Sequence, residues 1–148
     1  MNHTFYLTLP SGADADGVIG RYRTTLNRQV ILDGSYDWYV GLVDFVYPPS
    51  FSNKTSLFHI FCDLGASVPY GDRELMGYLG RVAPGKSENI SYPLRKEEFF
   101  QLSLIPVKRN LRVLSDVEIH ITDDSFNTVH FTSGSSAVTL VLQPEIPI

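Results

Sequence analysis

The feature of this sequence that most constrains its fold is a two-residue alternation of apolar and polar side chains. In residues 116–124, Val117, Ile119 and Ile121 occupy every second position, with polar residues between them. Successive side chains of a β-strand point to opposite faces, so this run predicts a strand with one face in a core and one in water. Turn-forming residues interrupt such runs at short intervals, which is typical of a β-sandwich or barrel.

Eight runs predict strands, at about residues 4–9, 21–32, 38–47, 57–64, 75–82, 99–107, 116–124 and 137–143. Eight strands without crossover helices predict an all-β fold, a single jelly roll built as an eight-stranded antiparallel two-sheet sandwich. The last run is almost uniformly apolar, which predicts a strand buried on both sides. A short helix within residues 14–29 is an alternative, but its glycines weaken it, and we expect this segment to be extended.

Length and charge limit the number of domains and the class of partner. A chain of 148 residues suits one domain, 1–148, and its net charge of −4 argues against a nucleic-acid-binding surface. The first residues lack the charged start and long apolar run of a signal peptide, and no stretch reaches transmembrane length, so we expect no export and no membrane insertion. The single cysteine, Cys62, lies in an apolar run and is predicted to be a reduced, buried thiol.

The residue pattern offers no catalytic constellation, so we predict that the protein is not an enzyme and uses no cofactor. The histidines are scattered, without the paired spacing of a metal site. His120 and His130 would approach each other if their strands paired across residues 122–127, and we interpret them as solvent-facing rather than as metal ligands. The adjacent Asp123 and Asp124 are predicted to cap a turn, with a calcium site as the alternative.

Charged and aromatic residues outside the predicted core are the candidates for a contact surface. Residues 65–72 and 83–91 are expected to be surface loops that contribute to it. The basic clusters at residues 95–96 and 108–112 are small, and a solvated loop or contact with an acidic partner surface is favoured over binding of nucleic acid or acidic lipid. Four tyrosines are expected to be exposed, namely Tyr39, Tyr47, Tyr70 and Tyr92. The candidate interface residues are Tyr70, Asp72, Arg73, Lys86, Tyr92, Arg95 and Lys96.

Several strings of residues, in order along nearly the whole chain, resemble the penton, or minor capsid, proteins of Maverick/Polinton elements and adintoviruses. The strings are FYLTLPS at 5–11, LDG at 32–34, WYVGLVDFVYP at 38–48, FCDL at 61–64, YLGRV at 78–82 and VEIHITDD at 117–124, followed by Val129, Phe131, Gly134 and VTL at 138–140. The turn that follows the penultimate strand departs from the family, because Ser125 and Phe126 stand where its members often have Thr and Gly.

The resemblance implies a structural virion protein: a single jelly roll whose subunits form homopentamers at the five-fold vertices of an icosahedral capsid. The implied partners are further copies of the chain and a double-jelly-roll major capsid protein, and the implied location is the virion, after synthesis in the host cytoplasm or nucleus. One alternative function is a jelly-roll module that binds carbohydrate or peptide through exposed tyrosines and Trp38, although a core position for Trp38 is favoured. Another is a cupin-type metal enzyme.

Overall fold

A computed structural model describes residues 4–10, 20–47, 51–52, 54, 57–82, 104–131 and 136–145, and every helix or strand in these residues is a β-strand. The strands are β1 (Phe5–Pro10), β2 (Arg21–Ile31), β3 (Trp38–Val46), β4 (Phe58–Cys62), β5 (Ser67–Tyr70), β6 (Arg73–Met76), β7 (Tyr78–Val82), β8 (Ile105–Pro106), β9 (Val113–Thr122) and β10 (Ala137–Pro144). Within the described residues, then, no helix exists that could cross a membrane.

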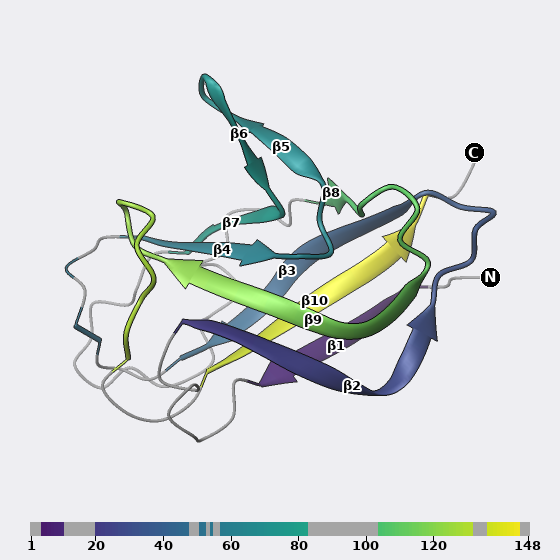
Figure 1. Ribbon diagram of the computed structural model, residues 1–148, viewed down its shortest axis with the longest axis horizontal. Coiled ribbons are helices and arrows are strands. Elements are labelled where there is room, and N and C mark those ends of the chain that lie inside the picture. Colours follow the sequence, from purple (N-terminus) through teal and green to yellow (C-terminus); the bar gives the residue numbers. More distant parts are fainter. Residues whose placement is uncertain are drawn as a thin grey trace.

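Eight of these strands form two antiparallel sheets, with the orders β1-β10-β3-β8 and β2-β9-β4-β7. The pairings are nested: β4 pairs with β7, β3 with β8, β2 with β9 and β1 with β10, as if one long hairpin had been rolled up. Figure 1 shows the long strands of both sheets running across the molecule, and the short hairpin β5–β6 rising from one side. This arrangement confirms the predicted two-sheet jelly-roll sandwich.

The core lies between the two sheets, as the alternation predicts. Val117, Ile119 and Ile121 on β9 are fully buried, whereas Glu118 and His120 between them are partly exposed. β10 is an inner strand with a neighbour on each side. Its residues Val138, Leu140 and Leu142 are fully buried, but Ala137, Thr139 and Gln143 are only partly buried, so the prediction of a strand buried on both sides holds in part. Burial of one apolar face per sheet is the main stabilising contribution in such a sandwich.

A β-bulge in β3 corrects the prediction that Tyr47 is exposed. Thr139 of β10 pairs with Asp44, but the next residue, Leu140, pairs with Leu42, so Val43 is left over. An extra residue reverses the phase of the alternation, and side chains after the bulge that would face water face the core instead. Tyr47 is therefore 1% exposed, while Tyr39, before the bulge, remains half-buried on the outer face.

The bulge completes an aromatic cluster at one end of the core. Tyr47 stacks on Phe45 with ring centroids 5.0 Å apart, and Phe58 of β4 meets both rings edge-on at 5.4 and 6.0 Å. Phe51 and Phe131 contact Phe58 from outside the sheets, at 4.9 and 6.2 Å. Phe58 thus joins strands of both sheets to the segments that cover this end.

The predicted strand at 75–82 and the predicted loop at 65–72 are both wrong in part, because a hairpin is inserted between β4 and β7. Gly77 has a φ of +69°, and a side chain there would collide with the carbonyl oxygen of Cys62. Only glycine combines this backbone conformation with so close an approach. The chain turns at Gly77, so residues 75–82 are divided between β6 and β7, and β5 occupies most of the predicted loop.

The remaining boundaries differ from the predictions by a few residues. β9 begins at Val113, three residues before the predicted start, and the described part of the predicted strand 99–107 contains the two-residue strand β8. Residues 21–29, part of the segment for which a helix is the alternative, form a strand. Residues 14–19, 83–91 and 99–103 lie outside the described residues. Cys62 is buried as predicted, and burial raises the pKa of its thiol to about 12.

Replacing Phe58 by alanine should lower the free energy of unfolding by ~3–5 kcal/mol, because it empties the centre of the aromatic cluster. Tyr6→Ala is the control: Tyr6 is 63% exposed on β1, and its loss should cost less than ~1 kcal/mol. Urea unfolding followed by fluorescence measures both values. Equal losses in the two variants would contradict the described core.

Candidate functional site

The hairpin β5–β6 has two faces with different environments. The paired residues Val68 and Leu75 are half-buried and buried, on the face toward the sandwich. On the other face, Ser67, Pro69, Glu74 and Met76 are all exposed. Because the strand period is two, one face of the hairpin is anchored to the molecule and the other is presented to solvent.

An aromatic cluster anchors the inner face. The ring of Tyr70 lies 5.3 Å from that of Tyr78 and 6.2 Å from that of His59. His59 Nδ1 and the Tyr78 hydroxyl are hydrogen-bonded at 2.8 Å. Phe126 packs on His59 at 4.9 Å and on Tyr70 at 6.1 Å. Tyr70 therefore serves within the chain to hold the hairpin against β4 and β7.

The turn after β9 supplies Phe126 to this cluster. Asp123 accepts hydrogen bonds at Oδ1 from the backbone N–H groups of Ser125 and Asn127, at 2.9 and 3.0 Å, which confirms the predicted turn cap. Phe126 has a φ of +63°, a conformation unfavourable for an aromatic residue. Its ring is stacked below Arg73, whose guanidinium carbon lies 5.1 Å from the ring centroid.

Of the seven predicted interface residues, three lie in the described part of the chain, and all three are at the hairpin tip. Tyr70 and Arg73 face the aromatic cluster, whereas Asp72 is exposed in the turn between the strands. The other four, Lys86, Tyr92, Arg95 and Lys96, lie outside the described residues. Asp72 and Glu74 make no ion pair or hydrogen bond through their side chains with other described residues. We call residues 67–76 the acidic hairpin.

A basic groove lies where the chain enters β9. It encloses about 570 Å³ and is lined by Trp38, Tyr39, Val107, Lys108, Arg109 and Arg112, with Asp37 as its acidic residue. The loop turns at Asn110, which has a φ of +71°, and Leu111 N–H donates to the Lys108 carbonyl at 3.1 Å. No carboxylate of the described residues pairs with Lys108, Arg109 or Arg112. The basic cluster was predicted from the sequence. The position of Trp38 and Tyr39 beside it, where they form one wall of the groove, was not.

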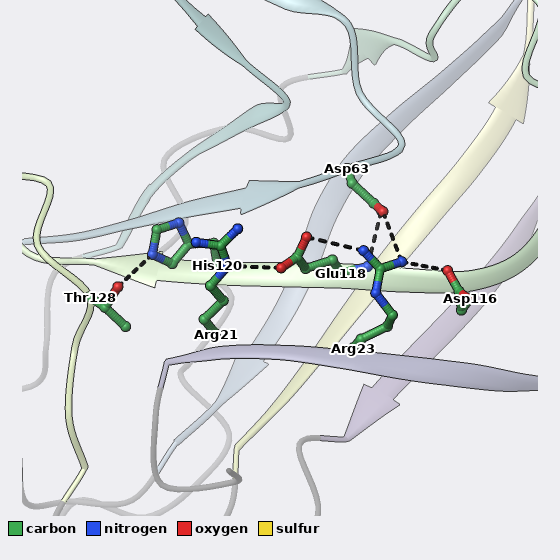
Figure 2. A network of polar contacts seen from close by, with 7 residues as sticks. All are labelled: Arg21, Arg23, Asp63, Asp116, Glu118, His120 and Thr128. Atoms are coloured by element: carbon green, nitrogen blue, oxygen red, sulfur yellow. Dashed lines mark hydrogen bonds and ion pairs between the residues drawn. The ribbon is translucent and has the colours of Figure 1, made fainter.

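Arg21 and Arg23 of β2 behave differently, because carboxylates of the same chain pair with them (Figure 2). Arg21 pairs with Glu118 at 2.8 Å, and Arg23 pairs with Asp116 at 2.5 Å and with Glu118 at 3.2 Å. Asp63, in the turn after β4, approaches Arg23 at 3.5 Å. The hydrogen bond from Arg21 lowers the pKa of Glu118 below its ordinary value. This network ties β2 to β9, and within it both arginines are paired with carboxylates of the same chain.

The histidines do not form a metal site in the described residues, which contain no group of three metal-ligating side chains. After β9 the chain turns back, and Thr122 forms an antiparallel bridge with Thr128. This is the pairing across residues 122–127 that was expected to bring His120 and His130 closer. His120 Nε2 is hydrogen-bonded to the Thr128 hydroxyl at 2.8 Å, and His130 is exposed. Trp38 is 6% exposed and donates from Nε1 to the Asp33 carbonyl, so its predicted core position is confirmed.

No protein-family model matches the chain, and no curated protein matches it.

Replacing Tyr70 by alanine should release the hairpin while leaving the sandwich folded. Each aromatic pair contributes ~0.5–1.5 kcal/mol, so backbone amides of residues 67–76 should exchange with solvent about tenfold faster. Hydrogen–deuterium exchange measures this, with Met76→Ala on the exposed face as the matched control. Equal exchange in the two variants would contradict the anchoring role of Tyr70.

Acidification should weaken the fold through His59. Burial lowers the pKa of His59 below its ordinary value of 6.5, because the imidazolium is poorly solvated there; Asp123 and Asp124 oppose this shift, and Arg81 adds to it. Because the pKa of His59 is lower in the folded chain than in the unfolded chain, the folded state is favoured most above the unfolded pKa, where the histidine is neutral. As the pH falls below that value, the free energy of unfolding decreases by at most ~1.4 kcal/mol per pH unit.

The free energy of unfolding of His59→Gln should therefore fall less steeply than that of the wild type between pH 6.5 and 5. Above pH 8 the histidine is neutral in both states, and the two curves should run parallel, which serves as the control. Equal slopes below pH 6.5 would exclude His59 as the source.

Proposed function

We propose that this chain is a structural virion protein, a penton or minor capsid subunit that forms homopentamers at the five-fold vertices of an icosahedral capsid. The observation that carries the proposal is the nested jelly-roll topology. Several of the strings that resemble the penton proteins lie on its strands. FYLTLP forms β1, WYVGLVDFV forms β3, YLGRV forms β7 and VEIHIT ends β9. The resemblance and the fold therefore concern the same residues.

The surface supports an assembly role as well. Closed rings of identical subunits need a heterologous interface, in which one patch meets a different patch on the neighbour. The acidic hairpin and the basic groove are two such unlike patches on one subunit. The proposed role requires no cofactor and no catalytic residue, and its partners are further copies of the chain and a double-jelly-roll major capsid protein in the virion.

The test is the mass of the purified protein in solution and its incorporation into capsids. By mass photometry over rising concentration, we expect a species of five times the monomer mass, and co-expression with the major capsid protein should place the chain in the particles. A chain that remains monomeric at the highest concentration and is absent from the particles would refute the proposal.

A carbohydrate- or peptide-binding module is the second candidate, and one observation favours it: Tyr39 lines the basic groove. Trp38 and Tyr47, which also motivated this function, are buried. Binding of the monomer on a glycan array, abolished by Tyr39→Ala, would favour the module over the capsid subunit.

A further inference from the structure

We propose that the acidic hairpin of one subunit docks in the basic groove of the next subunit, so that this contact closes the ring. The inference rests on the proposed function, because it names the contact through which the copies would assemble. The proposed occupant of the groove is the exposed side of residues 67–76 in a second copy of this chain.

Charge complementarity is the first argument. In a chain of net charge −4, the groove gathers three cations against Asp37, and no described carboxylate neutralises them. Arg21 and Arg23 of β2, by contrast, are paired within the subunit. The hairpin presents the opposite charge, because Asp72 and Glu74 are exposed and Arg73 is turned toward the Phe126 ring. Unlike charges on facing patches steer association and fix its orientation.

The hairpin of the same subunit is anchored with its tip outside the groove. Its base adjoins the groove, because Ala66, directly before β5, is one of the lining residues and its N–H donates to the Pro106 carbonyl. From there the hairpin rises away from the sandwich (Figure 1), and Tyr70 and Arg73 hold its tip at Phe126, in the turn that follows β9. Asp72 and Glu74 are not among the residues that line their own groove, so the proposed occupant is the hairpin of a second copy.

The shape of the two patches is compatible with insertion. A groove of about 570 Å³ lies within the ~300–1,000 Å³ of typical ligand sites, and Tyr39 and Val107 give it apolar walls. The exposed side of the hairpin combines its acids with Pro69 and Met76, and Met76 is 56% exposed. Apolar contact flanked by charge pairs is the usual composition of a protein interface.

The decisive experiment uses two charge-reversal variants of the full chain. The hairpin variant carries Asp72→Lys and Glu74→Lys, and the groove variant carries Lys108→Glu and Arg109→Glu. By mass photometry, each alone should lose the ring, with at least tenfold weaker association. An equimolar mixture should associate beyond the dimer into oligomers of alternating variants, because the intact hairpin fits the intact groove and the lysine hairpin fits the glutamate groove. The chain with all four substitutions should form rings again.

Arg28→Glu is the charge-reversal control, because Arg28 is exposed on β2 and does not line the groove, and it should leave the ring intact. Circular dichroism checks that each variant is folded. Rings formed equally by the wild type and both variants would refute the hairpin–groove contact and leave the proposed function standing. A wild type that never leaves the monomeric state would refute the proposed function and this contact together.

Cysteine cross-linking tests the same contact without reversing any charge. A chain with Glu74→Cys and Arg109→Cys should form a ladder of covalent oligomers on oxidation, because Cys62 is buried and unreactive. Glu74→Cys with Arg28→Cys is the matched control and should give no ladder. Equal ladders from both pairs, or none from either while rings are present, would overturn the proposal.

Discussion

The structure depends on β9 and β10, two of the four inner strands of its sheets, each of which needs a partner on both sides. β10 lies between β1 and β3, and β9 lies between β2 and β4. Their partners all come from the first half of the chain, so neither four-stranded sheet is complete until the C-terminal third has folded back. Such long-range pairing is entropically costly to begin, and it is repaid by burial of the alternating apolar residues between the sheets.

The same nesting explains where the chain can vary without loss of the core. The connection between β4 and β7 is the innermost turn of the rolled hairpin, and it is there that β5 and β6 are inserted. Gly77 lets the chain return close to Cys62, with Cys62 N–H donating to the Gly77 carbonyl at 2.9 Å. An insertion at this point extends from the sandwich and does not disturb any core pairing, which suits it to contact with other molecules.

Sequence reasoning predicted the sandwich well because its signal, alternation every two residues, is local. It failed where a single residue changes the phase or direction of the chain. Val43 looks like any other aliphatic residue of its strand, yet as a bulge it moves Tyr47 from the surface to the core. Gly77 divides a run that otherwise resembles one strand. Phe126, which completes the anchor of the hairpin, acts through a left-handed backbone conformation that a phenylalanine does not signal.

The candidate site was predictable only in its charges. The basic cluster at residues 108–112 and the acids Asp72 and Glu74 are visible in the sequence, but their separation on the surface depends on the path of β9 and on the anchored hairpin. In this account, unlike patches on one rigid jelly roll join copies of it into a ring of five. Cryo-electron microscopy of the purified protein tests that claim most directly. We expect five-fold rings in which each hairpin enters the neighbouring groove; two-fold dimers joined through one shared surface, or monomers alone, would contradict it.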